Sequence, residues 1–84
     1  MERAIVLMKV RTGKVDELAK QLVKIKGISD VYSVGGRFNL VVVAGARNQE
    51  ALEVLVAEKM AELVGIDYTE TLPVFQTYRP HRGR

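Results

Sequence analysis

The 84-residue chain contains no cysteine and no tryptophan, and its single histidine, His81, stands close to the C-terminal end. The absence of cysteine excludes disulfides, thiolate nucleophiles and sulfur-ligated metals. A metal site needs about three protein ligands, and a Ser-His-Asp arrangement needs a histidine beside its nucleophile. We therefore expect no metal, no cofactor and no catalytic residues, as in a protein that is not an enzyme.

Apolar runs long enough to cross a membrane are missing too, because the longest ones have only the length of a strand. The N-terminus begins directly in a strand pattern and shows none of the features of a signal peptide. These absences favour a cytoplasmic protein without a membrane partner.

An excess of positive charge is confined to one end of the chain. Lysine and arginine number 13 against 10 aspartates and glutamates, but Arg79, Arg82 and Arg84 lie at the C-terminal end. Without these three, basic and acidic side chains balance and are interleaved, whereas binding to nucleic acid needs clustered cations. We expect no direct DNA binding, one domain at 1–79 and a solvated basic tail at 80–84.

Hydrophobic periodicity predicts six elements, separated by glycines and other turn-forming residues. The first apolar run, IVLMKV, is typical of a strand, and Asn48 is placed to cap a helix that Gly65 ends. Pro73 lacks a backbone donor, so the last strand should lie at a sheet edge or be broken near its middle. The predicted strands cover residues 4–10, 28–34, 38–44 and 66–78, and the predicted helices cover 14–26 and 48–64.

The order βαββαβ most often folds as a four-stranded antiparallel sheet with both helices on one face, the ferredoxin-like arrangement of the α+β class. Right-handed crossovers place the first and third strands in the centre and the second and fourth at the edges. The first and third strands are also the most apolar ones, as that arrangement requires.

Two helices cover only one face of such a sheet, so the other face of a monomer should be polar. Side chains alternate along a strand, yet both alternating sets of the two central strands are apolar. Leaving each large apolar side chain in water forgoes about 1.5 to 3 kcal/mol, and such a patch usually marks an interface. We expect the open face to pack on a second copy as a two-fold dimer. The simpler alternative is that these strands are merely strong sheet formers.

One polar cluster remains as a candidate binding site, at the glycine-rich hairpin before the third predicted strand. Glycines allow a backbone to approach a ligand with its N–H groups free, and an amide both donates and accepts. A free amino acid needs hydrogen-bond donors for its carboxylate and acceptors for its ammonium group. A turn with a locally hydrogen-bonded asparagine is the simpler interpretation of these residues. On the last strand, alternation predicts that Ile66 and Tyr68 share one face of the sheet and that Thr69 and Thr71 lie on the other face. The candidate residues are Gly36, Arg37, Phe38, Asn39, Thr69 and Thr71.

Three stretches of the sequence together indicate a family: IVLMKV, IKGISDVYSVGGRFNLVVVA and GIDYTETLPVFQTYR. Over nearly its whole length the chain resembles the C-terminal effector domain, or RAM domain, of the Lrp/AsnC (feast/famine) transcriptional regulators. The residues from Gly36 to Leu40 look like that family's signature of glycine, any residue, aromatic, aspartate and aliphatic residue. Asn39 replaces the usual aspartate, which removes one negative charge.

The resemblance implies a ferredoxin-like domain that dimerises through its sheet, with dimers joining into rings such as octamers. It also implies a small effector, commonly an amino acid, between dimers, with Gly36, Arg37, Phe38 and Asn39 on the loop side and Thr69 and Thr71 on the strand side. Family regulators carry a helix-turn-helix domain before this one, whereas the first predicted strand begins at residue 4. We expect a stand-alone effector domain that senses a metabolite, mixes with full-length Lrp/AsnC regulators, or both.

Two other classes of function remain open. A small dimeric α+β barrel enzyme uses the same βαββαβ unit to enclose a pocket between sheet and helices, and would need an acid or base there. A purely structural assembly subunit would associate without binding a ligand. The leading hypothesis is a non-enzymatic, oligomeric effector-binding domain that acts in transcriptional regulation.

Overall fold

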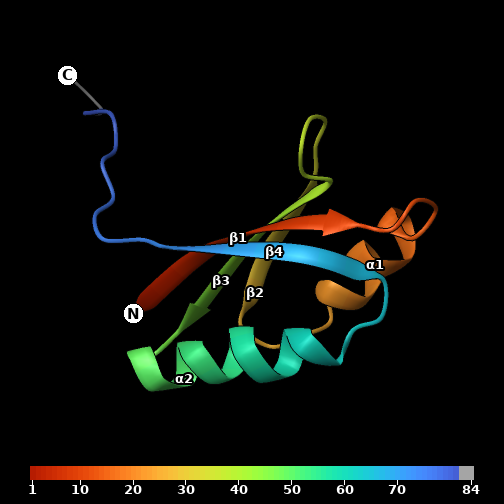
Figure 1. Cartoon of the computed structure of the whole chain (residues 1–84). Helices are drawn as coiled ribbons and strands as arrows, with labels where there is room; N and C mark the ends of the chain where they lie inside the picture. Colours follow the sequence, from red (N-terminus) through yellow and green to blue (C-terminus); the bar gives the residue numbers. More distant parts are fainter. Residues whose placement is uncertain (82–84) are drawn as a thin grey trace.

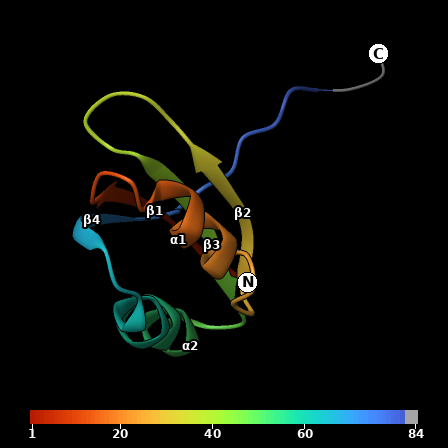
Figure 2. The same ribbon diagram turned by 90° about the vertical axis from the view of Figure 1, so that its right-hand side faces the viewer.

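The computed structural model describes residues 1–81, and the predicted tail residues 82–84 lie outside the described part. A four-stranded antiparallel sheet carries the helices on one side (Figures 1 and 2). The strand order is β2-β3-β1-β4, which confirms the predicted central and edge positions and the ferredoxin-like fold. The strands are β1 (Glu2–Val10), β2 (Ile28–Ser33), β3 (Leu40–Ala46) and β4 (Ile66–Pro73). The helices are α1 (Val15–Leu22) and α2 (Gln49–Val54), which continues as a π-helical turn (Leu55–Lys59) and a 3₁₀ turn (Met60–Glu62).

The register between the strands decides which apolar set faces the helices. Val6 of β1 lies opposite Val42 of β3, and Met8 lies opposite Leu40. Directly opposed residues point to the same face of a sheet, and all four of these side chains are buried. Together with helix residues they form one core, which consists of Ala4, Val6, Met8, Val10, Leu18, Leu22, Leu40, Val42, Ala44, Leu52, Leu55 and Met60.

The first helix ends one turn earlier than predicted. α1 stops at Leu22, and the amides of Lys24 and Ile25 then donate to carbonyls three residues back. These tighter turns bring Ile25 onto the core. Gly27 follows with φ of +102°, a conformation that favours glycine, and leads the chain into β2.

The second helix begins as predicted, because the Asn48 side chain accepts a hydrogen bond of 2.8 Å from the Ala51 amide. Its later part departs from α-helical spacing. Leu55 and Met60, five residues apart, are both buried, and a π-helical turn lets residues at this spacing face the same way. The apolar face predicted for this segment therefore meets the sheet although the backbone is not a regular α-helix.

The last strand is an edge strand, as predicted, but it ends at Pro73 instead of Tyr78. Its alternation also breaks at the start. Val10 pairs with Ile66 and Lys9 pairs with Tyr68, so one residue between them is left unpaired in a bulge. Ile66 consequently packs on the core, and the prediction that it shares a face with Tyr68 is wrong.

The sheet face opposite the helices is apolar, which confirms the sequence-based expectation for this surface. The residues at the centre of this face are partly exposed, and the large apolar side chains that the two edge strands place beside them are exposed. The face has at its centre Ile5 and Leu7 of β1 and Val41 and Val43 of β3, with Tyr32 of β2 and Tyr68 and Leu72 of β4 at its sides. Within residues 1–81, no helix has the length and apolar character needed to span a bilayer.

Candidate functional site

The hairpin between β2 and β3 is longer than predicted, since six residues at 34–39 connect the strands instead of three. A hydrogen bond of 2.9 Å from the Val34 amide to the Asn39 carbonyl closes it. Gly36 has φ of +117°, and nothing lies within 4 Å of where a Cβ would be. Within the described residues, no backbone N–H from residue 35 to residue 38 donates a hydrogen bond. The loop stands out from the sheet (Figure 1) with these donors available.

Asn39 anchors this loop to β1. Its Oδ1 accepts a hydrogen bond of 2.8 Å from the Val10 amide, and its own amide donates to the Met8 carbonyl at 2.8 Å. Val10 lies beyond Met8 and Leu40, the last pair between β1 and β3, so the Asn39 side chain supplies an acceptor where that ladder has ended. The simpler interpretation of Asn39, a locally satisfied amide, therefore accounts for its Oδ1. Its Nδ2 donates to no other described residue and stays available.

The aromatic residue of the hairpin reaches the last strand. The ring of Phe38 stacks on that of Tyr68, with centroids 6.2 Å apart and an interplanar angle of 21°. The Arg37 guanidinium carbon lies 5.6 Å from the centroid of the Phe38 ring. Such contacts contribute about 0.5 to 1.5 kcal/mol each. They hold the hairpin over the open sheet face, because Tyr68 points to that face.

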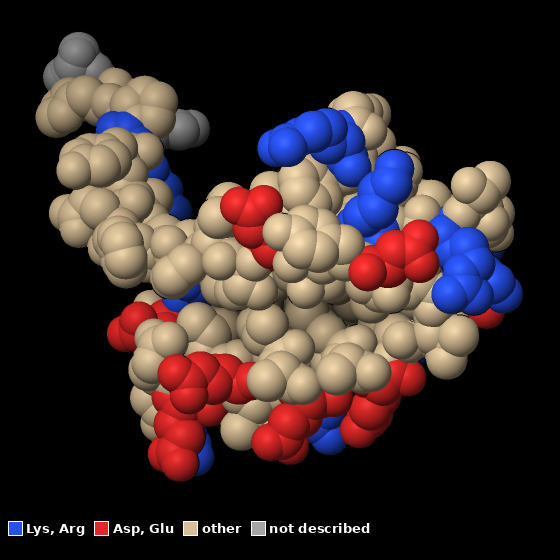
Figure 3. Space-filling model, viewed as in Figure 1, with Lys and Arg blue, Asp and Glu red and all other residues tan. Residues whose placement is uncertain are grey.

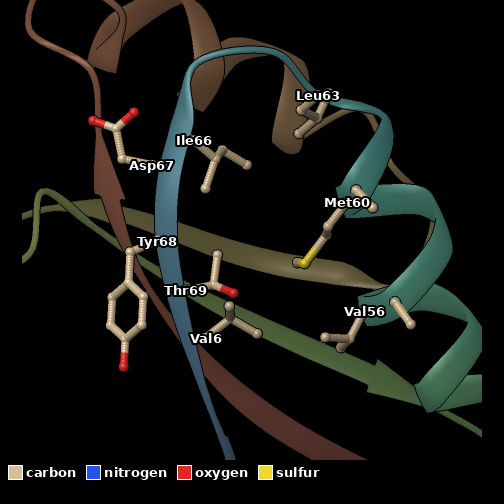
Figure 4. A pocket seen from close by; sticks show the side chains of 10 residues that line it. Val6, Val56, Met60, Leu63, Ile66, Asp67, Tyr68 and Thr69 are labelled. Atoms are coloured by element: carbon tan, nitrogen blue, oxygen red, sulfur yellow. The ribbon is translucent and has the colours of Figure 1, made fainter.

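The two threonines point to the opposite side of the sheet. Thr69 lies opposite Met8 and Thr71 opposite Val6, both of which face the helices. Figure 4 shows the Thr69 side chain directed between β4 and the continuation of α2, into a groove of about 520 Å³. A smaller cavity of about 200 Å³ beside it is lined by Thr71 and Pro73. The apolar side chains around Thr69 in the larger groove are Val6, Val56, Met60, Leu63 and Ile66.

The six predicted site residues thus form two groups in one copy of the chain. Gly36, Arg37, Phe38 and Asn39 lie together at the hairpin, over the open face. Thr69 and Thr71 line the groove on the helix side of β4. A ligand that contacts both groups therefore has to take the hairpin from one copy and the groove from another.

The groove occupies the place where an α+β barrel enzyme would hold its substrate, but its lining offers little acid or base chemistry. Asp67 borders it, yet its carboxylate points away from the cavity (Figure 4). That carboxylate lies 3.8 Å from the Arg11 guanidinium in an exposed ion pair. Among residues 1–81, acidic, histidine and cysteine side chains nowhere gather in the threes that a metal ion needs. Within the described residues the groove thus presents mainly apolar side chains and the Thr69 hydroxyl.

Charges that are interleaved in the sequence separate in the folded chain. Figure 3 shows mainly acidic side chains along α2 and its continuation, whereas most of the basic side chains in this view lie around the hairpin and the end of β1, with a few acidic ones among them. Of the basic residues at that end, Arg11 is paired with Asp67, whereas Lys9 and Arg37 are exposed and form no ion pair with another described residue. Clustered charge of one sign raises the local concentration of oppositely charged ligands. The hairpin end therefore favours an anionic group.

Sequence reasoning missed two residues that shape the hairpin. Tyr68 adjoins the predicted Thr69, but alternation alone did not show that it meets Phe38. Val10 carried no signal at all, because the hydrogen bond from its amide to Asn39 spans 29 positions. An exposed aromatic residue on an edge strand is the feature that could have indicated Tyr68.

Comparison with known proteins assigns residues 3–83 to a sequence family described as the Lrp/AsnC ligand binding domain. The HTH-type transcriptional regulator FL11 of Pyrococcus abyssi is 33% identical over 76 residues, which are 90% of this chain and 50% of that protein. FL11 of Pyrococcus furiosus is 32% identical over the same shares. The chain thus spans about half the length of these regulators.

Solved structures show the same fold. TTHA0845 from Thermus thermophilus superposes with a TM-score of 0.87 at 31% identity, over 95% of this chain and 100% of that one. AsnC from E. coli superposes with a TM-score of 0.86 at 17% identity, over 96% and 55%. The regulator NMB0573 from Neisseria meningitidis, solved as a complex with L-Met, has a TM-score of 0.82 at 14% identity, over 94% and 53%. For the last two, the likeness shows the fold alone.

Proposed function

Because the chain belongs to the family of Lrp/AsnC ligand-binding domains, we propose that it binds a small metabolite, an amino acid in the first place, and regulates transcription through its assembly. A regulator of the same fold has been solved with L-Met, which supports an amino acid as the ligand. The observation that carries the proposal is the exposed hairpin with its unused hydrogen-bond donors at the basic end of the molecule. On this proposal the protein is not an enzyme.

The hairpin is suited to the carboxylate of such a ligand. Arg37 offers a guanidinium group, Asn39 offers its Nδ2, and the loop backbone offers N–H groups. Charge-assisted hydrogen bonds to a carboxylate are about twice as strong as neutral ones. The hairpin itself contains no carboxylate, so it provides little for an ammonium group. The ammonium and side chain would instead meet hydroxyls and apolar groups of the kind that line the groove at Thr69.

Assembly supplies the second half of the site. The hairpin and the threonines lie on opposite sides of the sheet in one copy. Pairing of two copies through their apolar faces leaves each Thr69 groove on the outer, helix-covered side, so a shared ligand would lie where the hairpin of one such pair meets the groove of another. A ligand held between copies stabilises the assembled state by its differential affinity for that state. Binding and oligomeric state should therefore change together.

Isothermal calorimetry with a panel of amino acids, methionine first, tests the proposal, with sedimentation velocity reporting the assembly. For the best binder, the des-amino carboxylic acid should still bind, whereas the decarboxylated amine should not. Arg37→Gln should weaken binding at least about tenfold. Arg47→Gln, which changes an exposed arginine away from the hairpin, is the matched control and should bind normally.

A panel without any binder would contradict the sensing proposal. Binding of the decarboxylated amine in place of the acid would contradict the assigned orientation. Equal binding by the Arg37 and Arg47 variants would show that the ligand does not use the hairpin.

A further inference from the structure

The chain beyond β4 forms an extended arm, residues 74–81, that leaves the body of the molecule. Figures 1 and 2 both show it rising on the side of the sheet away from α2. Two hydrogen bonds hold its base, one of 2.9 Å from the Val74 amide to the Arg3 carbonyl and one of 2.7 Å from Arg3 Nη2 to Thr77 Oγ1. Beyond this base, Phe75 is 90% exposed and Tyr78 is 86% exposed. Two large aromatic side chains therefore have almost no contact with their own chain.

The arm has the sequence of a strand but lacks a strand to pair with. The stretch VFQTY consists mainly of β-branched and aromatic residues, which favour strands. Pro73 pairs with Ala4, and the Val74 bond to Arg3 is the last backbone hydrogen bond to β1 among the described residues. The strand β1 begins at Glu2, so its ladder has almost no length left for the arm. The sequence thus favours a strand as far as Tyr78, but β4 ends at Pro73 because β1 offers no further residues to pair with.

We propose that this arm pairs with and packs on a second copy of the chain, so that Phe75 and Tyr78 of each copy cover part of the other copy's open sheet face. This inference rests on the proposed self-association and adds to it the segment that is exchanged. A two-fold axis would make the exchange mutual, each copy giving one arm and receiving one.

The open face has the composition of a surface that meets its own copy. Its centre is apolar, and its four charged residues lie toward the periphery, at the ends of β1 and on the edge strands. This is the usual anatomy of an apolar interface core with a polar rim. Two of the charges are positive and two negative, so a second copy is not repelled. The four residues are Arg3, Lys9, Asp30 and Glu70.

The reach of the arm matches the thickness of such a pair. Eight extended residues span about 26 Å, whereas two sheets packed face to face lie about 10 Å apart. The arm can therefore pass from its own sheet to the partner's sheet and run along it. Because the arm continues β4, docking it would also hold the strand that carries Thr69 and Thr71 against the partner.

The double variant Phe75→Ala/Tyr78→Ala tests the proposal in the full chain. Its matched control is Val23→Ala/Val64→Ala, which trims two exposed apolar residues that follow α1 and precede β4. By sedimentation equilibrium, the arm variant should raise the dimer dissociation constant at least about 30-fold, the loss expected for two aromatic interface residues. The control variant should associate as the wild type does. Circular dichroism should show the same fold in both, since the arm makes few contacts with its own body.

Hydrogen exchange on the wild-type protein gives an independent measurement. The amides of residues 75–79 should be protected in the associated protein and should lose protection in Leu7→Glu, which places a charge in the centre of the open face. If Leu7→Glu dissociates the protein while the arm variant associates normally and arm amides exchange freely, the exchanged arm is wrong and self-association stands. A wild-type chain that remains monomeric at high concentration would overturn both.

Discussion

Replacing Asn39 with alanine should destabilise the fold even without any ligand. The substitution removes the acceptor for the Val10 amide, which is part-buried and 2.8 Å away. A buried donor left without a partner costs about 1 to 3 kcal/mol. For a domain of this size that loss lowers the midpoint of thermal unfolding by about 4 to 8 °C per kcal/mol.

Asn39→Asp is the informative companion. An aspartate retains an oxygen at the same place, so it should still accept from Val10 and lose much less stability than alanine. It also replaces the Nδ2 donor with a negative charge, and should therefore weaken binding of a carboxylate ligand at the hairpin. Asn39→Asp therefore separates the contribution of Oδ1 to stability from the contribution of Nδ2 to ligand binding.

Urea unfolding followed by circular dichroism measures the free energies of unfolding. All variants must be compared at one protein concentration, because association adds to apparent stability by mass action. If the alanine variant is as stable as the wild type, the hydrogen bond to Val10 does not anchor the hairpin. If the aspartate variant is as unstable as the alanine variant, the side-chain oxygen is not the reason for the loss.

Two further predictions concern the backbone. Gly27→Ala should lower the free energy of unfolding by more than about 1 kcal/mol, because φ is +102° and an added Cβ would lie 2.8 Å from Leu55 Cδ2 and 3.0 Å from the Gly45 carbonyl oxygen. The control is Gly35→Ala, where nothing lies within 4 Å of an added Cβ. Equal urea midpoints for the two variants would contradict this prediction. Asn48→Ala should lower the free energy of unfolding by about 1 kcal/mol by removing the cap on the Ala51 amide, and an unchanged thermal midpoint would show that the cap contributes nothing.

The amino-acid sequence by itself determined the order of the elements, the central and edge positions of the strands and the apolar character of both sheet faces. These features depend on periodicity and on local rules, such as the side-chain cap at Asn48 and the missing donor of Pro73. They are readable because each depends on residues a few positions apart. The resemblance of the Gly36 to Leu40 stretch likewise indicated the family that comparison then showed.

Only the tertiary structure decided how the candidate site is divided. The bulge beside Lys9 turned Ile66 to the core and left Tyr68 on the open face, where it meets Phe38. Folding also committed Asn39 to an amide 29 positions away and separated charges that alternate in the sequence. Register, long-range hydrogen bonds and the arrangement of surface charge depend on which distant segments lie side by side, and no local pattern records that. For the same reason the arm at 74–81 looks like a strand in the sequence, while only the fold shows that its own copy has no partner for it.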